Sequence, residues 1–222
     1  KWLPAAMVAP TPVSALLHAV AVVKAGVFTI LKVGVYIFGI DFLKTTGSSD
    51  WLVWLAGFSI LSASIVAITK DNLKARLAYS TISQLSYITL GLALANAVGV
   101  LGGALHIATH AVGKITLFMC AGSIYIATHK TQVSDMDGLG RKMPITFLAF
   151  FVGAISIIGL PPMGGSWSKW LLVLSALEAE YILIVAALMI SSLLNIAYLI
   201  PVVSRGFFLK PKESIEKLGL SP

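Results

Sequence analysis

Long apolar runs, separated by short polar connections, are the feature that most restricts how this chain can fold. The runs at 12–39, 51–69 and 181–204 approach or exceed the roughly 20 residues that a helix needs to cross a bilayer. Hydrophobic residues make up 58% of the chain and charged residues 11%, which is far from the composition of water-soluble domains. Because helices satisfy their own backbone groups in lipid, the sequence predicts an all-α polytopic membrane protein.

We expect a single transmembrane domain over residues 1–222, with six transmembrane segments, one of them discontinuous. The first segment begins at Thr11-Pro12, where Thr caps a helix and Pro occupies its first turn. Residues 128–142 are expected to form a solvated connection, and residues 205–222 a basic cytoplasmic tail. The expected spans are 12–39, 51–69, 77–97, 99–127, 143–177 and 181–204.

The fifth segment contains a break in its helical pattern. Residues 143–177 are too many for one straight crossing and too few for two comfortable ones. Prolines remove backbone donors and glycines relax the chain, and irregular backbone at membrane depth occurs where it is buried or lines a wet cavity. The residues expected to form this break, near 159–165, are Gly159, Pro161, Pro162, Gly164 and Gly165.

Positive charge is distributed unevenly between the connections. If the broken segment crosses once, one side of the membrane receives Lys1, Lys70, Lys74, Arg76, Lys130, Arg141, Lys142, Arg205, Lys210, Lys212 and Lys217. The other side receives Lys44 and the region of Lys32, so we expect both chain ends in the cytoplasm and the protein in the cell (inner) membrane. No soluble recognition element accompanies the net charge of +7, which argues against nucleic-acid binding.

Ionisable side chains lie inside these apolar runs. His106, His110 and Lys114 follow at one-turn intervals in the fourth span and form a polar stripe about 12 Å long on one helix face. Lys24 lies in the first span, and Lys169 follows the break. Placing such a group in a bilayer costs about 2.5–3.5 kcal/mol, so groups like these mark an ion or proton path.

The spans that hold these five residues contain no Asp or Glu at depth. Burial and mutual repulsion disfavour the charged form of a lysine, and a lysine close to neutrality can take up and release protons. Histidine titrates closest to neutral pH. We therefore expect Lys24, His106, His110, Lys114 and Lys169 to form a proton relay with water between them. The expected supporting polar residues are His18, Ser83, Gln84, Tyr87 and Ser168.

Plainer explanations of the same residues stay open. Lys24 and Lys169 can snorkel or pair with a neighbouring subunit, and His106 and His110 can form an interhelical hydrogen-bonded pair. We expect no metal site, because no third Cys, Asp or Glu ligand lies near the two histidines in the sequence. We expect no cofactor, because one Cys and no dinucleotide motif leave nothing to bind an iron–sulfur cluster or a flavin.

Several motifs closely resemble one family of membrane proteins. They are Trp2-Leu3-Pro4, the run from Ala9 to Ala19, Lys24-Ala25-Gly26-Val27, Asp71-Asn72-Leu73-Lys74, the run from Leu77 to Leu85, the His106/His110/Lys114 helix, Gly159-Leu160-Pro161-Pro162 and Ser168-Lys169. Together they cover essentially the whole chain. The chain resembles the proton-conducting antiporter-like subunits that Mrp-type multisubunit cation/proton antiporters share with the membrane arm of respiratory complex I.

The resemblance implies a fourteen-helix subunit built from two inverted five-helix repeats, each with a broken helix, and a line of charged groups along the membrane midplane. This chain then corresponds to helices eight to thirteen and is a fragment of a larger subunit. By the same resemblance, Lys24 links two half-channels, Lys114 or its neighbouring histidines form the central relay, and Lys169 lies near the exit. The carboxylate partner of these cations is then expected in the absent first seven helices.

The leading interpretation is a D-like, ion-translocating subunit of a multisubunit monovalent cation (Na⁺)/proton antiporter, which moves protons through the Lys/His chain. Trp167 before Ser168-Lys169 favours it by resemblance, because complex I relatives usually carry Phe there. The alternative is a proton-pumping subunit of NADH:quinone oxidoreductase (complex I) or of a related membrane-bound hydrogenase, with no redox chemistry in this chain. A third is a non-conducting scaffold. The expected partners are other membrane subunits, the lipid bilayer, protons and Na⁺.

Overall fold

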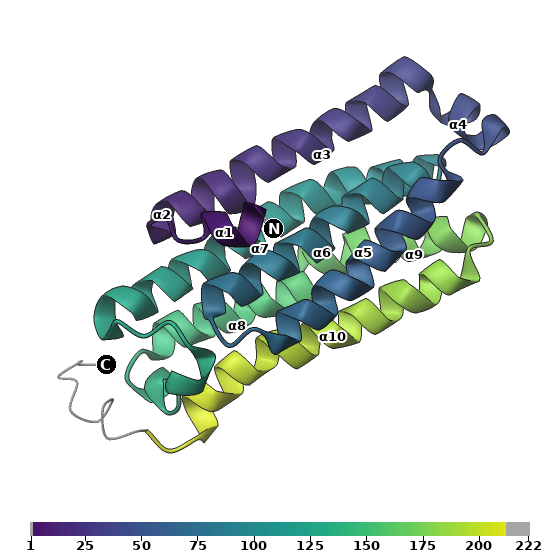
Figure 1. Cartoon of the computed structure of the whole chain (residues 1–222). Coiled ribbons are helices and arrows are strands. Elements are labelled where there is room, and N and C mark those ends of the chain that lie inside the picture. Colours follow the sequence, from purple (N-terminus) through teal and green to yellow (C-terminus); the bar gives the residue numbers. More distant parts are fainter. Residues whose placement is uncertain (1, 212–222) are drawn as a thin grey trace.

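The computed structural model describes residues 2–211, which form a bundle of helices lying side by side (Figure 1). In chain order the elements are α1 (Trp2–Ala6), α2 (Thr11–Val13), η1 (Ser14–Ala21), α3 (Val22–Lys32), η2 (Val33–Phe38), α4 (Ile40–Thr46), α5 (Asp50–Thr69), α6 (Leu73–Ala93), α7 (Ala97–Thr128), η3 (Val133–Asp135), η4 (Leu139–Arg141), α8 (Pro144–Ile158), α9 (Gly164–Glu178) and α10 (Ile182–Phe208). The elements η1 and η2 have wider π-helical turns, and η3 and η4 are short 3₁₀ helices. Lys1, Lys212 and Lys217, which contribute to the charge asymmetry, lie outside the described residues.

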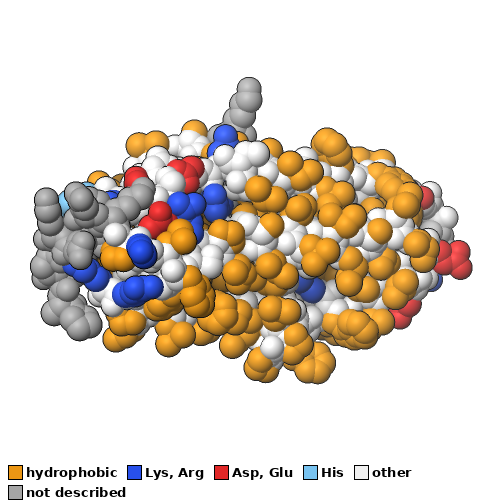
Figure 2. All heavy atoms as spheres, turned by 90° about the horizontal axis from the view of Figure 1, so that it is seen from below, with side chains coloured by type: hydrophobic (Ala, Val, Ile, Leu, Met, Phe, Trp, Pro, Cys, Tyr) orange, Lys and Arg blue, Asp and Glu red, His pale blue; other side chains and the backbone are white. Residues whose placement is uncertain are grey.

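The described part of the chain is an all-α, multi-pass membrane protein. Four helical stretches are long and apolar enough to cross a membrane, namely Thr11–Phe38, Asp50–Thr69, Ala97–Thr128 and Ile182–Phe208. Together with the 21-residue α6 and the α8–α9 pair they make six transmembrane segments, of which the α8–α9 pair is discontinuous. In Figure 2 hydrophobic side chains cover the middle of the visible face, and most charged side chains gather at its two ends.

The helix α6 begins at Leu73, four residues before the expected start of the third span at 77. Asn72 sets this start, because its side-chain oxygen accepts a hydrogen bond from the Ala75 amide at 3.1 Å. Lys74 and Arg76 therefore lie in the first turn of α6 and not in a free connection. The buried Arg76 donates to the carbonyl oxygens of Lys70 and, in α10, Tyr198.

The connection between α7 and α8 is packed against the bundle, contrary to the expectation of a solvated loop over 128–142. Val133, Met136 and Leu139 are buried in the main hydrophobic core. Asp137 in this connection forms an ion pair with Arg205 of α10, with 2.8 Å between its carboxylate and the guanidinium. Apolar residues spaced along a turn-rich segment leave no helical or strand period, so the sequence does not reveal this burial.

Glycines bring the backbones of α6 and α7 into direct contact. A Cβ atom added at Gly91 of α6 would lie 2.5 Å from the carbonyl oxygen of Gly99 in α7, and one added at Gly99 would lie as close to that of Gly91. Gly103, one turn further along α7, faces the backbone of Ile88. Small residues allow this close approach, which brings the polar face of α6 against the His/Lys face of α7.

The fifth segment runs along α7 as two short helices. Ile157, near the end of α8, packs against Gly113 in the middle of α7. In α9, Leu172 packs against Gly102, near the start of α7. Asn96, which caps α7, donates to the Ser175 carbonyl oxygen of α9 at 3.0 Å. The helices α8 and α9 therefore pack one after the other along the length of α7. The break between them lies beside the middle of α7.

Replacing Leu139 by Ala tests whether the 128–142 connection is part of the core. Leu139 is completely buried, so Leu139→Ala should lower the free energy of unfolding by about 2–5 kcal/mol. Thr131→Ala is the control, because Thr131 is half-buried and uses its main-chain carbonyl oxygen, which accepts from the Leu73 amide. Thermal unfolding of the detergent-purified protein measures both. Equal melting temperatures for the two variants would contradict the packing described above.

Candidate functional site

Lys24 follows the π-helical element η1 and is buried in the first segment. Its ammonium group donates a hydrogen bond of 2.7 Å to the carbonyl oxygen of Ala19 within η1. The charge of Lys24 also interacts with His106, His110 and Lys114 of α7. The first segment therefore brings a cation to the middle of α7.

Lys114 is completely buried in the middle of α7. Its ammonium group donates to the Leu77 carbonyl oxygen at 3.0 Å and to the Ser80 hydroxyl at 2.8 Å, both on α6. A buried charge needs such partners, because its transfer out of water is otherwise very unfavourable. None of Lys24, Lys114 and Lys169 bonds a carboxylate within residues 2–211.

His106 is held on both sides of its ring. Its Nε2 lies 3.1 Å from the Gln84 side-chain oxygen of α6, and its Nδ1 lies 2.8 Å from the Ser168 hydroxyl of α9. An amide oxygen only accepts, so Nε2 carries a proton in this arrangement. The Ser168 hydroxyl also lies 3.1 Å from the Gly165 carbonyl oxygen, to which it can donate instead. Ser168 can therefore donate to a neutral His106, or accept from a protonated one while donating to Gly165.

His110 lies one turn from His106, with the two rings stacked at 5.8 Å between centroids. Both of its ring nitrogens are buried without a hydrogen-bond partner among the described residues. The charges of Lys24, Lys114, His106 and Lys169 all act on it. His110 is thus the point at which the cations from α3, α7 and α9 converge.

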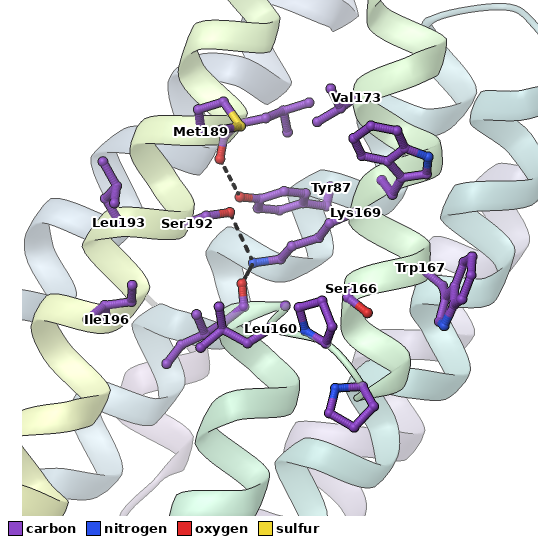
Figure 3. Close-up of a pocket in the computed structure, with 16 residues that line it drawn as sticks. Tyr87, Leu160, Ser166, Trp167, Lys169, Val173, Met189, Ser192, Leu193 and Ile196 are labelled. Carbon is purple, nitrogen blue, oxygen red and sulfur yellow. Dashed lines mark hydrogen bonds between the residues drawn. The ribbon is translucent and has the colours of Figure 1, made fainter.

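Lys169 lies in α9 just after the break and beside a cavity of about 880 Å³ between α9 and α10 (Figure 3). Its ammonium group donates to the Ile158 carbonyl oxygen at 2.9 Å and to the Ser192 hydroxyl of α10 at 3.5 Å. Ile158 is the last residue of α8, and the negative end of a helix dipole favours a cation there. The break therefore supplies the site for the Lys169 cation.

The Tyr87 ring lies between Lys169 and His106. The Lys169 ammonium is 5.1 Å from the ring centroid, and the His106 ring stacks on Tyr87 at 5.6 Å between centroids. Its hydroxyl donates to the Leu188 carbonyl oxygen of α10 at 3.5 Å. One aromatic side chain of α6 thus connects the cation at the break with the histidine stripe.

The break residues bring α8 and α9 together at close range. Gly159 has a φ of 91°, in the left-handed region that favours glycine, and ends α8. At Gly165 a Cβ atom would overlap the carbonyl oxygen of Ser156. Pro161 and Pro162 line the cavity, and Gly164 begins α9. Irregular backbone here lies beside a cavity, the setting in which membrane proteins tolerate it.

Two of the expected supporting residues point elsewhere. Ser83 donates to the Ile60 carbonyl oxygen and lies 2.9 Å from the Ser64 hydroxyl, so it joins α6 to α5. His18 is half-buried on η1, and its Nδ1 is buried without a partner among the described residues. It makes no hydrogen bond to the Lys/His line, which consists of Lys24, His106, His110, Lys114 and Lys169. Gln84, Tyr87 and Ser168 contact the line directly.

The sequence pattern did not single out Tyr198 and Asn195 of α10, and it indicated no site role for Ser80. Ser80 bonds Lys114, and Tyr198 bonds Ser80 at 2.9 Å. Tyr198 also donates to Asn195, and all three side chains are buried. The sequence offers one weak indication of a polar site on this helix, namely polar residues at 191, 192, 195 and 198 with helical spacing in an otherwise apolar helix.

The two stacked histidines have no third metal ligand beside them in the described part of the chain. Within 2–211, no group of three or more His, Cys, Asp or Glu side chains lies in position to hold a metal ion.

The sequence of this chain matches one family of membrane proteins over most of its length. That family is described as NADH:quinone oxidoreductase/Mrp antiporter, TM, and the match covers residues 1–195. The chain belongs to this family. Its members named below are subunits of multisubunit complexes, as their own descriptions state.

Two curated relatives show how much of a family member this chain represents. NADH-quinone oxidoreductase subunit N of Desulforudis audaxviator (strain MP104C) is 39% identical over 207 residues, which are 93% of this chain and 41% of the relative. NADH-quinone oxidoreductase subunit L of Rickettsia bellii (strain RML369-C) is 38% identical over 182 residues, which are 81% of this chain and 26% of the relative. The chain spans less than half the length of these relatives.

Solved structures share the fold. The membrane-bound sulfane sulfur reductase, an archaeal respiratory membrane complex, has a chain 29% identical with a TM-score of 0.85, covering 97% of this chain and 45% of that chain. The Mrp complex from Dietzia sp. DQ12-45-1b has one 25% identical with a TM-score of 0.87, covering 95% of this chain and 39% of that chain. Respiratory complex I from Thermus thermophilus, at 24% identity and a TM-score of 0.84, supports the fold alone. The chain therefore has the antiporter-like fold.

Replacing Gly165 by Ala tests the close contact of α8 and α9 at the break. The added methyl group would overlap the Ser156 main-chain oxygen, so α8 and α9 must separate, and Gly165→Ala should destabilise the protein by about 1–3 kcal/mol. Gly26→Ala is the matched control, because a Cβ atom there has nothing within 4 Å. Thermal unfolding of both variants in detergent is the measurement. A Gly165→Ala protein as stable as Gly26→Ala would show that the break is looser than described.

Proposed function

We propose that this chain translocates protons across the membrane along Lys169, His106, His110, Lys114 and Lys24, with water between them, as part of a larger multisubunit membrane complex. The observation that carries the proposal is the hydrogen bonding of His106. Its partners Gln84 and Ser168 can accommodate both the neutral and the protonated ring, because the Ser168 hydroxyl has a second acceptor in Gly165. A side chain that has hydrogen-bond partners in both protonation states can receive and pass on a proton without moving.

The neighbours of His106 give it two connections. Ser168 precedes Lys169 in the chain, and the Tyr87 ring lies between Lys169 and His106. On the other side, the stacked His110 leads to Lys114 and Lys24. Repulsion among these cations limits how many of them carry a charge at once. A proton arriving at one end of the line therefore favours the release of a proton at the other end.

The positive-inside rule supports an orientation for the path. Lys70, Lys74, Arg141 and Arg205 lie at the ends of helices and in connections at one end of the bundle, whereas Lys44 lies at the other. We propose that the end with more basic residues faces the cytoplasm and that the complex lies in the cell (inner) membrane. The connecting role of Lys24 and the exit role of Lys169 remain part of this proposal.

The partners of the chain follow from its share of the family fold. Residues 2–211 supply no carboxylate to the three buried lysines, and the relatives are more than twice as long as this chain. We propose that the remaining helices of the complete subunit, together with other membrane subunits, provide the counter-charge and the rest of the path.

Neutral replacement of the buried lysines tests the relay. Lys114→Met and Lys169→Met should each lower proton transport about tenfold or more, because each variant removes a group that takes up and releases protons. Lys32→Met is the matched control, because Lys32 is exposed in the same segment as Lys24 and its ammonium group lies over the Phe28 and Tyr36 rings of that segment. A pH-sensitive dye in vesicles that hold the complete assembly reports the flux. Wild-type transport in normally assembled Lys114→Met and Lys169→Met complexes would favour the non-conducting scaffold.

The identity of the assembly is a separate question with two candidate answers. The names of the relatives at 39% and 38% identity favour an NADH:quinone oxidoreductase-type complex. The Mrp structure, at 25% identity and a TM-score of 0.87, keeps a Na⁺/proton antiporter as the second candidate. We propose the oxidoreductase-type assembly, in which this chain performs no redox chemistry.

Purification of the complex from native membranes distinguishes the two. We expect mass spectrometry to identify quinone-reducing subunits beside this chain, and proton transport to persist when choline replaces Na⁺. Small antiporter subunits together with a strict Na⁺ requirement would instead establish the Mrp-type assembly.

A further inference from the structure

A chain of hydrogen bonds leaves Lys114 and crosses to α10. The Lys114 ammonium lies 2.8 Å from the Ser80 hydroxyl, and the Ser80 hydroxyl lies 2.9 Å from that of Tyr198. The Tyr198 hydroxyl in turn contacts the Asn195 side-chain oxygen. All four side chains are completely buried, so no bulk water competes for these bonds. This chain is separate from the His106–His110 stripe, which follows α7 on the other side of Lys114.

When Lys114 is charged, it is fixed which group of this hydrogen-bond chain donates to which. An ammonium group only donates, so the Ser80 oxygen accepts from Lys114, and each hydroxyl has one proton to give. Because Asn195 presents its oxygen, Tyr198 gives its one proton to Asn195. Tyr198 then has no proton left for its contact with the Ser80 hydroxyl, so in this arrangement Ser80 is the donor and Tyr198 the acceptor. Every hydroxyl proton then points away from Lys114. The chain therefore stabilises the positive charge.

Asn195 offers the opposite direction as well. Its side-chain nitrogen is buried without a hydrogen-bond partner among the described residues, although buried polar groups are normally satisfied. If the amide turns over, this nitrogen donates to the Tyr198 oxygen, Tyr198 donates to Ser80, and Ser80 donates to the lone pair of a neutral Lys114 amine. The bonds between the same four groups are then kept, with all protons pointing toward Lys114. The only exchange is a rotation of two hydroxyls and one amide.

We propose that Ser80, Tyr198 and Asn195 are positioning residues that form a hydrogen-bond chain of reversible direction and hold Lys114 in both its charged and its neutral form. This inference rests on the proposed relay role of Lys114 and adds residues of α6 and α10 to it. The hydrogen-bond chain lowers the difference in free energy between the two forms, because in each form the Lys114 nitrogen, both hydroxyl groups and the Asn195 atom that faces Tyr198 are hydrogen-bonded. Lys114 can then exchange a proton with His110 or Lys24 while keeping its place.

Several other ionisable groups lie on the elements packed around Lys114. The described residues of α8 contribute none. The groups are His18 on η1, Lys24 and Lys32 on α3, Lys74, Arg76, Tyr79 and Tyr87 on α6, His106, His110, Cys120 and Tyr125 on α7, Lys169 and Glu178 on α9, and Tyr198 and Arg205 on α10. Substitutions at Asn195 and Tyr198 leave all of these groups except Tyr198 unchanged. A change in the pH dependence of transport can therefore be traced to the direction of the hydrogen-bond chain.

The pH profile of proton transport by the complete assembly tests the direction of the chain. Asn195→Leu removes the acceptor at the far end, so Tyr198 and Ser80 can only point toward Lys114 and favour its neutral form. The pH of half-maximal transport should fall by about one unit or more, because a hydrogen bond to a charged group changes an equilibrium about tenfold or more. Ser86→Ala is the control, since the Ser86 hydroxyl donates to the Ile82 carbonyl oxygen of its own helix and makes no other side-chain hydrogen bond to the described residues.

A double variant separates this effect from simple loss of packing. Asn195 acts through the Tyr198 hydroxyl, so Tyr198→Phe with Asn195→Leu should have the same pH profile as Tyr198→Phe alone. An unchanged profile for Asn195→Leu, or a shift of the same size in the Tyr198→Phe background, overturns the proposal.

Infrared spectroscopy tests the hydrogen-bond chain independently of any transport measurement, and it uses Tyr198→Phe, which removes one hydroxyl group. The wild-type complex with isotope-labelled tyrosine should show a tyrosine C–O band that shifts between acid and alkaline pH and disappears in Tyr198→Phe and in Lys114→Met. A spectrum without such a band overturns the reversible chain even if Lys114→Met abolishes transport. If the band is present while Lys114→Met transports normally, the reversible chain stands and the proposed relay is wrong.

Discussion

Each buried ammonium group within residues 2–211 donates to a main-chain carbonyl oxygen, and the arrangement of the site depends on these bonds. Lys24 bonds Ala19 and Lys169 bonds Ile158, and both carbonyls belong to irregular backbone, in the π-helical η1 and at the end of α8. Lys114 bonds Leu77 across the α6–α7 contact. Carbonyl dipoles stabilise a cation without fixing its charge as a carboxylate would. Irregular backbone therefore holds Lys24 and Lys169 without a carboxylate among the described residues.

The helix α7 organises the site because three polar faces meet along it. Glycines at its start allow the backbone of α6 to come close, which places Ser80, Gln84 and Tyr87 beside the His/Lys stripe. The break in the fifth segment then places Ser168 and Lys169 opposite the same stripe. Hydroxyl groups that can both donate and accept surround the titratable groups. Proton exchange and close packing are therefore compatible in this bundle.

Trp167 does not decide between the antiporter and the oxidoreductase interpretations of this chain. Trp167, whose resemblance favoured the antiporter interpretation, is 65% exposed at the edge of the cavity and does not contact the Lys/His line. The names of the relatives favour the oxidoreductase interpretation. The residues proposed to exchange protons are the same under both interpretations, so the fold and the site do not depend on which assembly contains the chain.

The order of residues along the chain is enough to show which charged groups are buried in the membrane and where a helix must break. A lysine within an apolar run is costly to bury however its helix is rotated, and Pro161-Pro162 between glycines interrupts a helix in any orientation. Lys24, Lys114, Lys169 and the break could therefore be predicted from the sequence without a structure. The partner that each group finds emerges only when the helices pack together. Packing directed Ser83 to α5, brought Tyr198 to Ser80 and buried Leu139 in a connection expected to be solvated. These outcomes depend on how each helix is rotated and how close it lies to its neighbours, which is set by contacts between residues far apart in the chain, such as Gly91 with Gly99 and Leu172 with Gly102.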